Sequence, residues 1–120
     1  MNILEPGGTL DIDLIKNSFM LGEMVKGRVR LILDKPVKAR QFLISLTGQE
    51  WVDVSCGSDE IELSGGGVYD FVEKDFEFKI PENAPPTIEG AGAGLRWFVH
   101  AKLDLPIGRD KNARRELFVY

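Results

Sequence analysis

The sequence is poor in the residues that usually carry catalysis, metal binding and disulfides. It contains one cysteine, Cys56, and one histidine, His100, in 120 residues. A single cysteine excludes an intramolecular disulfide, and Cys56 lies among Gly and Ser without the basic neighbour that would activate a thiol. A lone histidine at an outward position of a predicted strand gives no hydrolytic triad. We therefore expect a protein that is not an enzyme and that binds no metal and no cofactor.

Long apolar runs and an excess of positive charge are also missing. No apolar stretch approaches the roughly 20 residues that span a bilayer. The first residues lack the basic start and apolar run of a signal peptide. The formal net charge is -4, which argues against nucleic acid because duplex binding depends on neutralising phosphates. These features predict a cytoplasmic protein with no membrane span and no nucleic-acid partner.

Two motifs that often mark ligand sites lack the context they need. Asp11 and Asp13 share a strand face and acidic residues cluster within residues 59–62, but no Asp-x-Asp-x-Asp-Gly loop accompanies them. Calcium requires six or more oxygen ligands, so a solvated surface explains these carboxylates better. The glycines of residues 90–94 follow a proline-rich stretch, whereas a dinucleotide-binding loop follows a strand and opens a helix. We interpret them as a flexible surface loop.

What the sequence has in abundance is apolar alternation with a period of two residues, which indicates strands with one buried face. The longest inward row is Leu95, Trp97, Val99, Ala101, Leu103 and Leu105. Shorter rows occur within residues 10–14, 25–33, 42–46 and 76–80, and residues 116–120 form a last predicted strand. Gly27 falls in an inward row, where a missing side chain indicates a bulge or a close crossing of strands.

Turn-forming residues separate these runs. Pro36 is expected to end a strand because proline cannot donate to a ladder, and Gly48 is a plausible bend. Residues 55–58 and 64–67 have the Gly and Ser content of turns. Connections of six residues or more favour Greek-key crossings between two sheets. The sequence therefore predicts one all-β domain over residues 1–120, an antiparallel immunoglobulin-like β-sandwich of about seven strands.

Three segments carry a resemblance to a known family. They are Gly22-Glu23-Met24-Val25-Lys26-Gly27-Arg28-Val29, then residues 39–50 with their Gly48-Gln49-Glu50 end, then Phe78-Lys79-Ile80-Pro81 followed by residues 95–104. In this order the chain resembles the first domain of the arrestin-fold superfamily, which includes classical arrestins, α-arrestins, a retromer subunit of similar shape and bacterial sporulation-control proteins. The resemblance implies an adaptor or scaffold that binds a protein or peptide. Members typically pair two such sandwiches, and this chain has the length of one.

Basic residues form the first candidate site. Lys26, Arg28 and Arg30 alternate on one face of a predicted strand, and Arg40 begins the next. Guanidinium groups pair bidentately with phosphate, so this stripe is a candidate for binding an acidic or phosphorylated partner. The other interpretation is a soluble sheet face that nearby carboxylates balance. By the same resemblance, Asp104 and Asp110 lie where the first arrestin domain carries acidic residues.

Aromatic residues outside the inward rows form the second candidate set. Trp51, Phe98 and Phe118 either anchor a partner or cover the outer sheet beneath a neighbouring loop or subunit, and both interpretations remain open. Leu117, Phe118 and Tyr120 are expected to lie on an open sheet edge that forms a homo-oligomer or docks a partner.

A carbohydrate-binding or other ligand-binding β-sandwich is the alternative function. Such modules present aromatic platforms to sugars, so this function requires Trp51 and Trp97 to be exposed and coplanar. Trp97 belongs to the predicted inward row, and the chain lacks an export signal. Both observations count against the alternative.

Overall fold

The computed structural model describes residues 6–50, 55–89 and 94–120. Within these ranges the chain forms nine β-strands and no helix. The strands are β1 (Gly8–Leu14), β2 (Ser18–Phe19), β3 (Met24–Ala39), β4 (Gln41–Glu50), β5 (Ser55–Ser64), β6 (Gly67–Lys79), β7 (Ile88–Glu89), β8 (Gly94–Asp104) and β9 (Lys111–Val119). Because β2 and β7 have only two residues each, seven long strands remain, as predicted.

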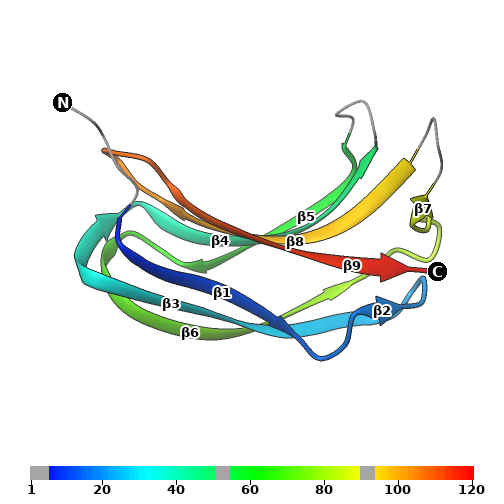
Figure 1. Ribbon diagram of the computed structural model, residues 1–120, viewed down its shortest axis with the longest axis horizontal. Coiled ribbons are helices and arrows are strands. Elements are labelled where there is room, and N and C mark those ends of the chain that lie inside the picture. The colour runs from blue at the N-terminus through cyan, green and yellow to red at the C-terminus, as the bar shows by residue number, and fades with distance from the viewer. Residues whose placement is uncertain (1–5, 51–54, 90–93) are drawn as a thin grey trace.

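The strands form two curved sheets that lie face to face (Figure 1). The smaller sheet has the order β1-β3-β6, and the larger has the order β2-β9-β8-β4-β5, with β7 also pairing to β8. Pairing is antiparallel except that β2 runs parallel to β9. The predicted all-β antiparallel sandwich is confirmed. In the described residues no helix is long and apolar enough to cross a membrane.

The core lies between the two sheets and takes the inward rows that alternation predicted. Trp97 is 1% exposed in the middle of the β8 row. Gly27 marks a close crossing, because a Cβ there would lie 2.4 Å from the carbonyl oxygen of Asp13 and 2.7 Å from Cζ of Phe76. In the row of residues 10–14, Ile12 is buried and Leu10 and Leu14 are half-buried. The buried residues of the other rows are Val25, Val29, Leu31, Leu33, Phe42, Ile44, Leu46, Phe76, Phe78, Ile80, Leu95, Val99, Ala101, Leu103 and Leu105.

Two of the crossings between the sheets are much shorter than predicted. The chain passes from β3 to β4 through Arg40 alone and from β5 to β6 through two glycines, Gly65 and Gly66. Ala39 pairs with Gly67 on one side of this corner. A single long ribbon of two strands therefore folds over at one end of the molecule (Figure 1). The crossing from β6 to β7 is longer and spans residues 80–87.

Three local predictions need correction. Pro36 does not end a strand: β3 runs on to Ala39, and its register with β6 shifts between Ile32 and Val37. The proline sits where the ladder is interrupted, so its missing N–H removes no ladder bond. Residues 55–58, predicted as a turn, lie within β5, and β9 begins at Lys111 rather than at residue 116. The predicted bend at Gly48 corresponds to a register shift between β4 and β5.

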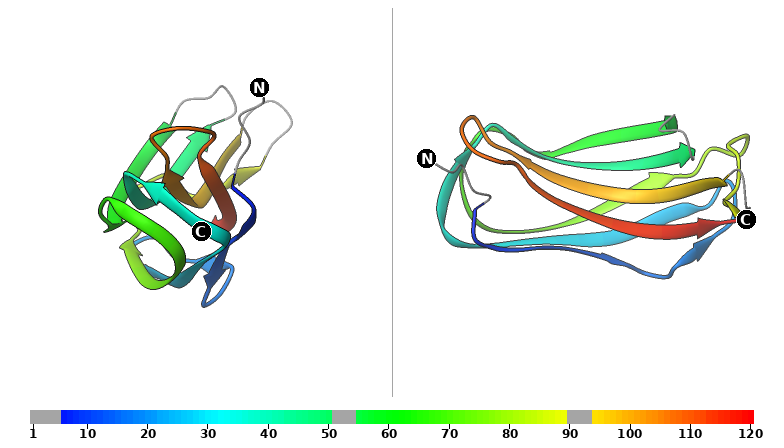
Figure 2. Two further views of the ribbon diagram at one scale, coloured as in Figure 1. Left: turned by 90° about the vertical axis from the view of Figure 1, so that its left-hand side faces the viewer. Right: turned by 45° about the horizontal axis from the view of Figure 1, so that its top comes forward.

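The two sides of the sandwich differ. On one side, here called the closed side, β1 lies against β9, and β2 continues the larger sheet beyond β9. On the other, here called the open side, β5 ends the larger sheet and β6 ends the smaller one. The end-on view places β5 and β6 together, away from β1 and β9 (Figure 2). Among the described residues, β5 pairs only with β4, and β6 pairs only with β3.

Candidate interaction surfaces

The basic row on β3 faces outward from the smaller sheet, and carboxylates of β6 balance it. Arg28 donates through Nε to Oδ1 of Asp75 at 2.8 Å and lies 3.0 Å from Oε1 of Glu73. Arg30 donates through Nε to Oε2 of Glu73 at 2.8 Å, and Lys26 lies opposite Glu77 in the ladder. Asp75 and then Glu73 raise the pKa of Arg28 above its usual value. The geometry favours the interpretation of a balanced sheet face.

A shallow hollow of about 730 Å³ borders this row. Its lining combines Lys26, Arg28 and Arg30 with the carboxylates of Asp13 and Asp75. A phosphate dianion entering the hollow meets basic groups and acidic groups together. An acidic ligand would have to displace the carboxylates that already hold the guanidinium groups, so the hollow is poorly suited to anions.

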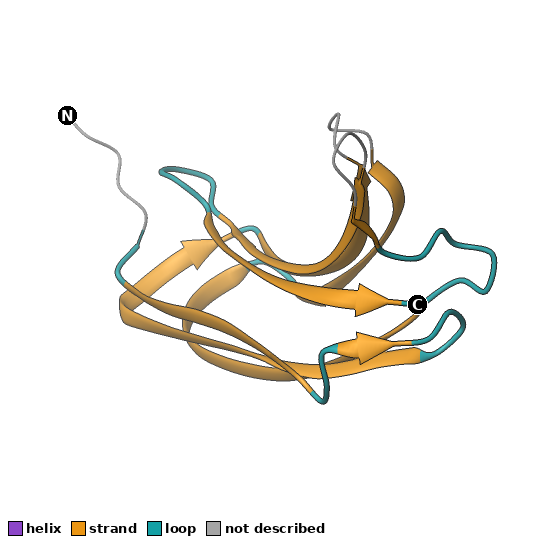
Figure 3. Cartoon of the chain, turned by 45° about the vertical axis from the view of Figure 1, so that its right-hand side comes forward, coloured by secondary structure: helices purple, strands orange, loops and turns teal. Residues whose placement is uncertain are grey.

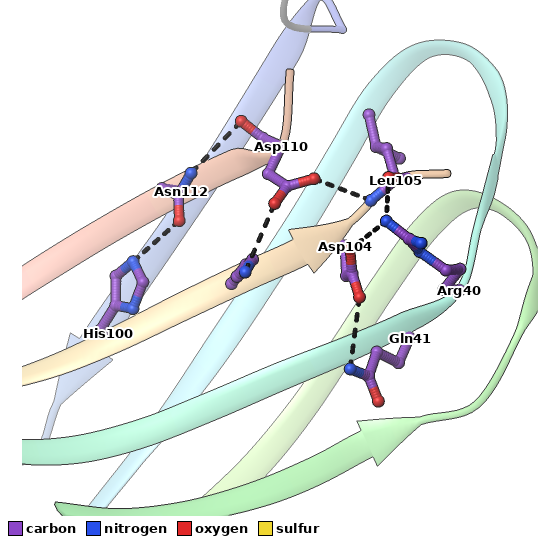
Figure 4. A network of polar contacts seen from close by, with 8 residues as sticks. Arg40, Gln41, His100, Asp104, Leu105, Asp110 and Asn112 are labelled. Carbon is purple, nitrogen blue, oxygen red and sulfur yellow. Dashed lines mark hydrogen bonds and ion pairs between the residues drawn. The ribbon is translucent and has the colours of Figure 1, made fainter. Parts of the chain in front are cut away.

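Arg40 lies apart from the other three basic residues, at the corner between the sheets. Its Nη2 donates to the carbonyl of Leu105 at 2.8 Å and to Oδ1 of Asp104 at 3.2 Å. Gln41 donates to the other oxygen of the same carboxylate at 3.3 Å, as Figure 4 shows. These bonds tie the start of β4 to the end of β8. The four predicted basic residues therefore do not form one site.

Asp110 has an equally local role in the connection between β8 and β9. Its Oδ1 accepts a hydrogen bond from the backbone N–H of Leu105 at 2.9 Å, and Oδ2 lies 3.4 Å from Nζ of Lys102 (Figure 4). The backbone hydrogen bond, followed by the Lys102 contact, lowers the pKa of Asp110 below its usual value. Asp104 and Asp110 thus stabilise neighbouring turns of this domain through contacts within it.

His100 lies on the outward face of β8 and is half-buried. Its Nε2 is 2.9 Å from Oδ1 of Asn112, whose amide donates to the carbonyl of Asp110 at 3.3 Å (Figure 4). Burial lowers the pKa of His100, and the nearby charge of Arg114 acts in the same direction. The contact between His100 and Asn112 joins the outward face of β8 to β9.

The aromatic candidates do not gather into one patch. Phe98 is half-buried, with the guanidinium carbon of Arg114 4.0 Å from its ring centroid. Phe118 and Tyr120 are 44% and 58% exposed, with ring centroids 6.3 Å apart, whereas Leu117 is buried in the core. Trp51 lies outside the described residues. Phe98 therefore covers the outer sheet beneath an arginine, while Phe118 and Tyr120 form a small exposed pair.

The prediction that residues 117–120 form an open edge is wrong. The N–H of Phe118 donates to the carbonyl of Asn17 at 2.9 Å, and that of Tyr120 donates to Phe19 at 3.0 Å. The chain ahead of β3 folds back as β2 and lies alongside the end of β9 (Figure 3). On its other side, Leu117 pairs with Trp97 of β8, and Val119 exchanges hydrogen bonds with Thr87. A docking partner cannot add a strand there.

Of the two edges on the open side, that of β6 is protected by charge. Its outward carboxylates, Glu73 and Asp75, are held by the arginines of β3. Lys74 stands in the inward row, opposite the buried Val29 in the ladder, yet is itself exposed. An inward-pointing charge on an edge strand is a known protection against pairing with another chain, because an added strand would have to bury it.

The edge of β5 differs in its exposed apolar residues and in the surroundings of its outward carboxylates, although its inward row also holds an acidic residue, Asp59, opposite the buried Leu46. Ile61 lies opposite the buried Ile44 and is 37% exposed, and Leu63 is half-buried against the core. On the outward face, Glu60 lies opposite Ser45 and Glu62 lies opposite Leu43. None of the ion pairs found among the described residues includes these two carboxylates. This edge therefore combines accessible apolar side chains with two carboxylates that take part in none of these ion pairs.

The structure does not provide the exposed Trp97 that the carbohydrate-binding alternative requires. Trp97 is buried, and its Nε1 donates to the carbonyl of Pro85 at 3.0 Å. It cannot stack on a sugar. Across the described ranges, no group of three or more His, Cys, Asp or Glu side chains is arranged to hold a metal ion. Cys56 falls within β5, and its side chain lies outside the described part.

Comparison with known proteins agrees with the fold. The family model described as the arrestin (or S-antigen) N-terminal domain matches residues 49–120. Among solved structures, the sporulation control protein Spo0M from Bacillus subtilis is similar, with a TM-score of 0.73 and 21% sequence identity. The match covers 94% of this chain and 49% of the Spo0M chain, so this chain spans about half the length of that protein. No curated protein matches.

Proposed function

The chain belongs to the arrestin family as a domain of the N-terminal type, and on that premise we propose that it is a non-enzymatic adaptor module that binds another protein. The observation that carries the proposal is the open side of the sandwich. There, two sheets end in strands that each pair on one side only within the described residues. Unpaired strand edges present rows of N–H and C=O groups, which extended peptides can use for strand addition.

The chemistry of the polar residues supports the same proposal. Hydrogen bonds of three polar residues stabilise the β8–β9 connection and the corner between β3 and β4; the residues are His100, Asp104 and Asp110. Groups used in this way contribute to rigidity, which a binding platform needs. The proposal includes a cytoplasmic location, which the single cysteine favours.

The test is to identify a partner and then to examine the purified pair. Tagged protein is used for capture from the lysate of the native host, and each stoichiometric candidate is purified and titrated by calorimetry. We expect a saturable complex in which the intact masses of both proteins stay unchanged after prolonged incubation. A mass change in the partner that requires this chain would show an enzyme instead and would contradict the proposal.

A further inference from the structure

We propose that β5 is the docking strand and that its ligand is an extended segment of another protein in which apolar and basic residues alternate. This inference rests on the proposed function and adds the site and the chemistry of the partner. Three features of β5 point to it: a backbone edge that pairs on one side only within the described residues, accessible apolar side chains on the inward face, and outward carboxylates whose cross-strand neighbours are uncharged.

The backbone provides the first feature. β5 has ten residues and pairs with β4 alone within the described parts of the chain. Alternate N–H and C=O groups of a strand point to the same side, so a strand with one neighbour leaves about half of these groups for another strand. Strands in globular proteins range over about 3–10 residues, so a ten-residue edge is at the long end of that range. The edge can therefore hold a complete added strand.

The inward face provides the second feature. Ile61 is 37% exposed although it lies in the row that faces the smaller sheet, and Leu63 beside it is also partly exposed. An added strand would place every second side chain next to this row, at the margin of the core. Apolar side chains at these positions would remove Ile61 and Leu63 from water, which is favourable in proportion to the area covered.

The outward face provides the third feature. Glu60 and Glu62 are exposed, and their cross-strand neighbours on β4 are Ser45 and Leu43, which carry no charge. Opposite charges directly across a strand pair stabilise it, and like charges destabilise it. The side chains of the added strand that alternate with its apolar ones would lie beside Glu60 and Glu62. Lysine or arginine at these positions matches the carboxylates.

The same charges argue against a second copy of this chain on β5. A two-fold antiparallel pair of β5 strands keeps outward rows beside outward rows. Registers that place Glu60 opposite Glu60 or Glu62 of the other copy bring like charges together, whereas a basic segment brings opposite charges together in any register. The partner is therefore a segment of different composition.

The experiment uses a fluorescent peptide of roughly eight residues in which valine and lysine alternate, titrated with the whole chain by fluorescence anisotropy. A second peptide has glutamate in place of lysine. Two further peptides carry backbone N-methyl groups on one or the other set of alternate amides, because strand addition uses only one set. The protein variants are E60K/E62K and, as a matched control on the other edge, E77K. Thermal melts confirm that the variants fold, which their exposed positions favour.

We expect the valine-lysine peptide to bind saturably and E60K/E62K to weaken it about 10- to 30-fold, since two attractive pairs become repulsive. The same variant should gain affinity for the valine-glutamate peptide. E77K should bind as wild type does. One N-methylated peptide should lose binding and the other should keep it.

Equal binding of both N-methylated peptides would overturn strand addition, and equal weakening by E77K and E60K/E62K would overturn the location. A wild-type dimer that forms through β5 would overturn the partner class. If a captured partner binds E60K/E62K as tightly as wild type, the docking strand is wrong while the proposed function stands. If neither peptides nor any captured protein binds, both fail.

Discussion

The edges of β5 and β6 lie on the same side of the sandwich, but their outward carboxylates have different surroundings. On β6, Glu73 bridges Arg28 and Arg30 of the neighbouring strand, and Lys74 stands in the inward row. On β5, Glu60 and Glu62 have uncharged cross-strand neighbours. The position of an acidic residue on an edge strand therefore does not by itself indicate its role. A carboxylate in an ion pair with the neighbouring strand stabilises the sheet, whereas a carboxylate with uncharged cross-strand neighbours can pair with a basic residue of a partner.

The closed side shows what a satisfied edge looks like in the same molecule. There the N–H groups of Phe118 and Tyr120 are bonded to residues next to and within β2. Thr87 adds a further tie, since its hydroxyl accepts from the N–H of Val119 at 2.8 Å. β2 has only two residues, yet it pairs with Phe118 and Val119 and so covers the end of β9. No equivalent segment covers β5 among the described residues.

The largest expected effect is on the free energy of unfolding, and it tests whether the open and closed sides of the sandwich share one core. Trp97 is buried on β8, between the sheets that carry the two edges. We expect Trp97→Ala to lower the free energy of unfolding by about 3–5 kcal/mol, the usual result of truncating a large buried aromatic residue. Denaturant unfolding followed by fluorescence and by circular dichroism measures this. A loss below about 1 kcal/mol, outside that range, would show that the core is misplaced.

The next prediction concerns a substitution that removes the charge protecting the edge of β6. Lys74→Val removes the inward charge of β6 and leaves a continuous apolar inward row, in which Val72 is half-buried and Phe76 is buried. We expect self-association to become about tenfold stronger, which corresponds to about 1.4 kcal/mol, because an added strand no longer buries an ammonium group. Sedimentation velocity over a concentration series measures it, with Lys79→Val at the strand end as the control. Unchanged association would remove Lys74 as the protecting residue.

Asp110 offers a carboxylate that is used internally, in contrast to Glu60 and Glu62. Its pKa is lowered in the folded protein, so its contribution to stability is present above the unfolded-state pKa and is lost as the pH falls through the folded-state value. Asp110→Ala should lower stability near pH 7 by about 1 kcal/mol, the usual value of one hydrogen bond. At low pH the two proteins should converge. A constant difference at all pH values would contradict the assigned role.

The smallest effect compares one carboxylate from each edge. Glu73→Gln breaks two ion pairs on β6 and should reduce stability by about 0.5–1 kcal/mol, less at high salt. Glu62→Gln breaks none of the ion pairs found in the described part of the chain and should leave stability within about 0.5 kcal/mol of wild type, as for most surface substitutions. Thermal unfolding at low and high salt measures both. Equal losses would mean that the two edges are not distinct.

The parts of the fold that the sequence predicted are those that local pattern determines. The apolar row from Leu95 to Leu105 alternates without interruption, so its strand and its buried face followed directly from a period of two. β5 was missed because Gly and Ser precede its alternation and its outward residues are acidic. The pattern Glu60-Ile61-Glu62-Leu63 was nevertheless present and could have indicated a strand with an acidic face.

The parts that the sequence could not predict depend on the arrangement of distant segments. Arg28 and Glu73 are 45 residues apart, and only the register of β3 against β6 brings them together. The balanced state of the basic row was therefore one of two interpretations until the register was known. β2 has no pattern of its own, since its two residues become a strand by pairing with β9. That pairing closes the edge that the sequence left open.

Amide hydrogen exchange read by NMR, with and without the valine-lysine peptide, tests the central claim most directly. In the free protein, the β5 amides that point away from β4 should exchange rapidly, while those of Phe118 and Tyr120 should exchange slowly because both are hydrogen-bonded. With the peptide, new protection should appear along β5 and leave β6 unchanged. Slow exchange along the whole of β5 in the free protein, or new protection on β6 instead, would contradict the assignment of β5 as the docking edge.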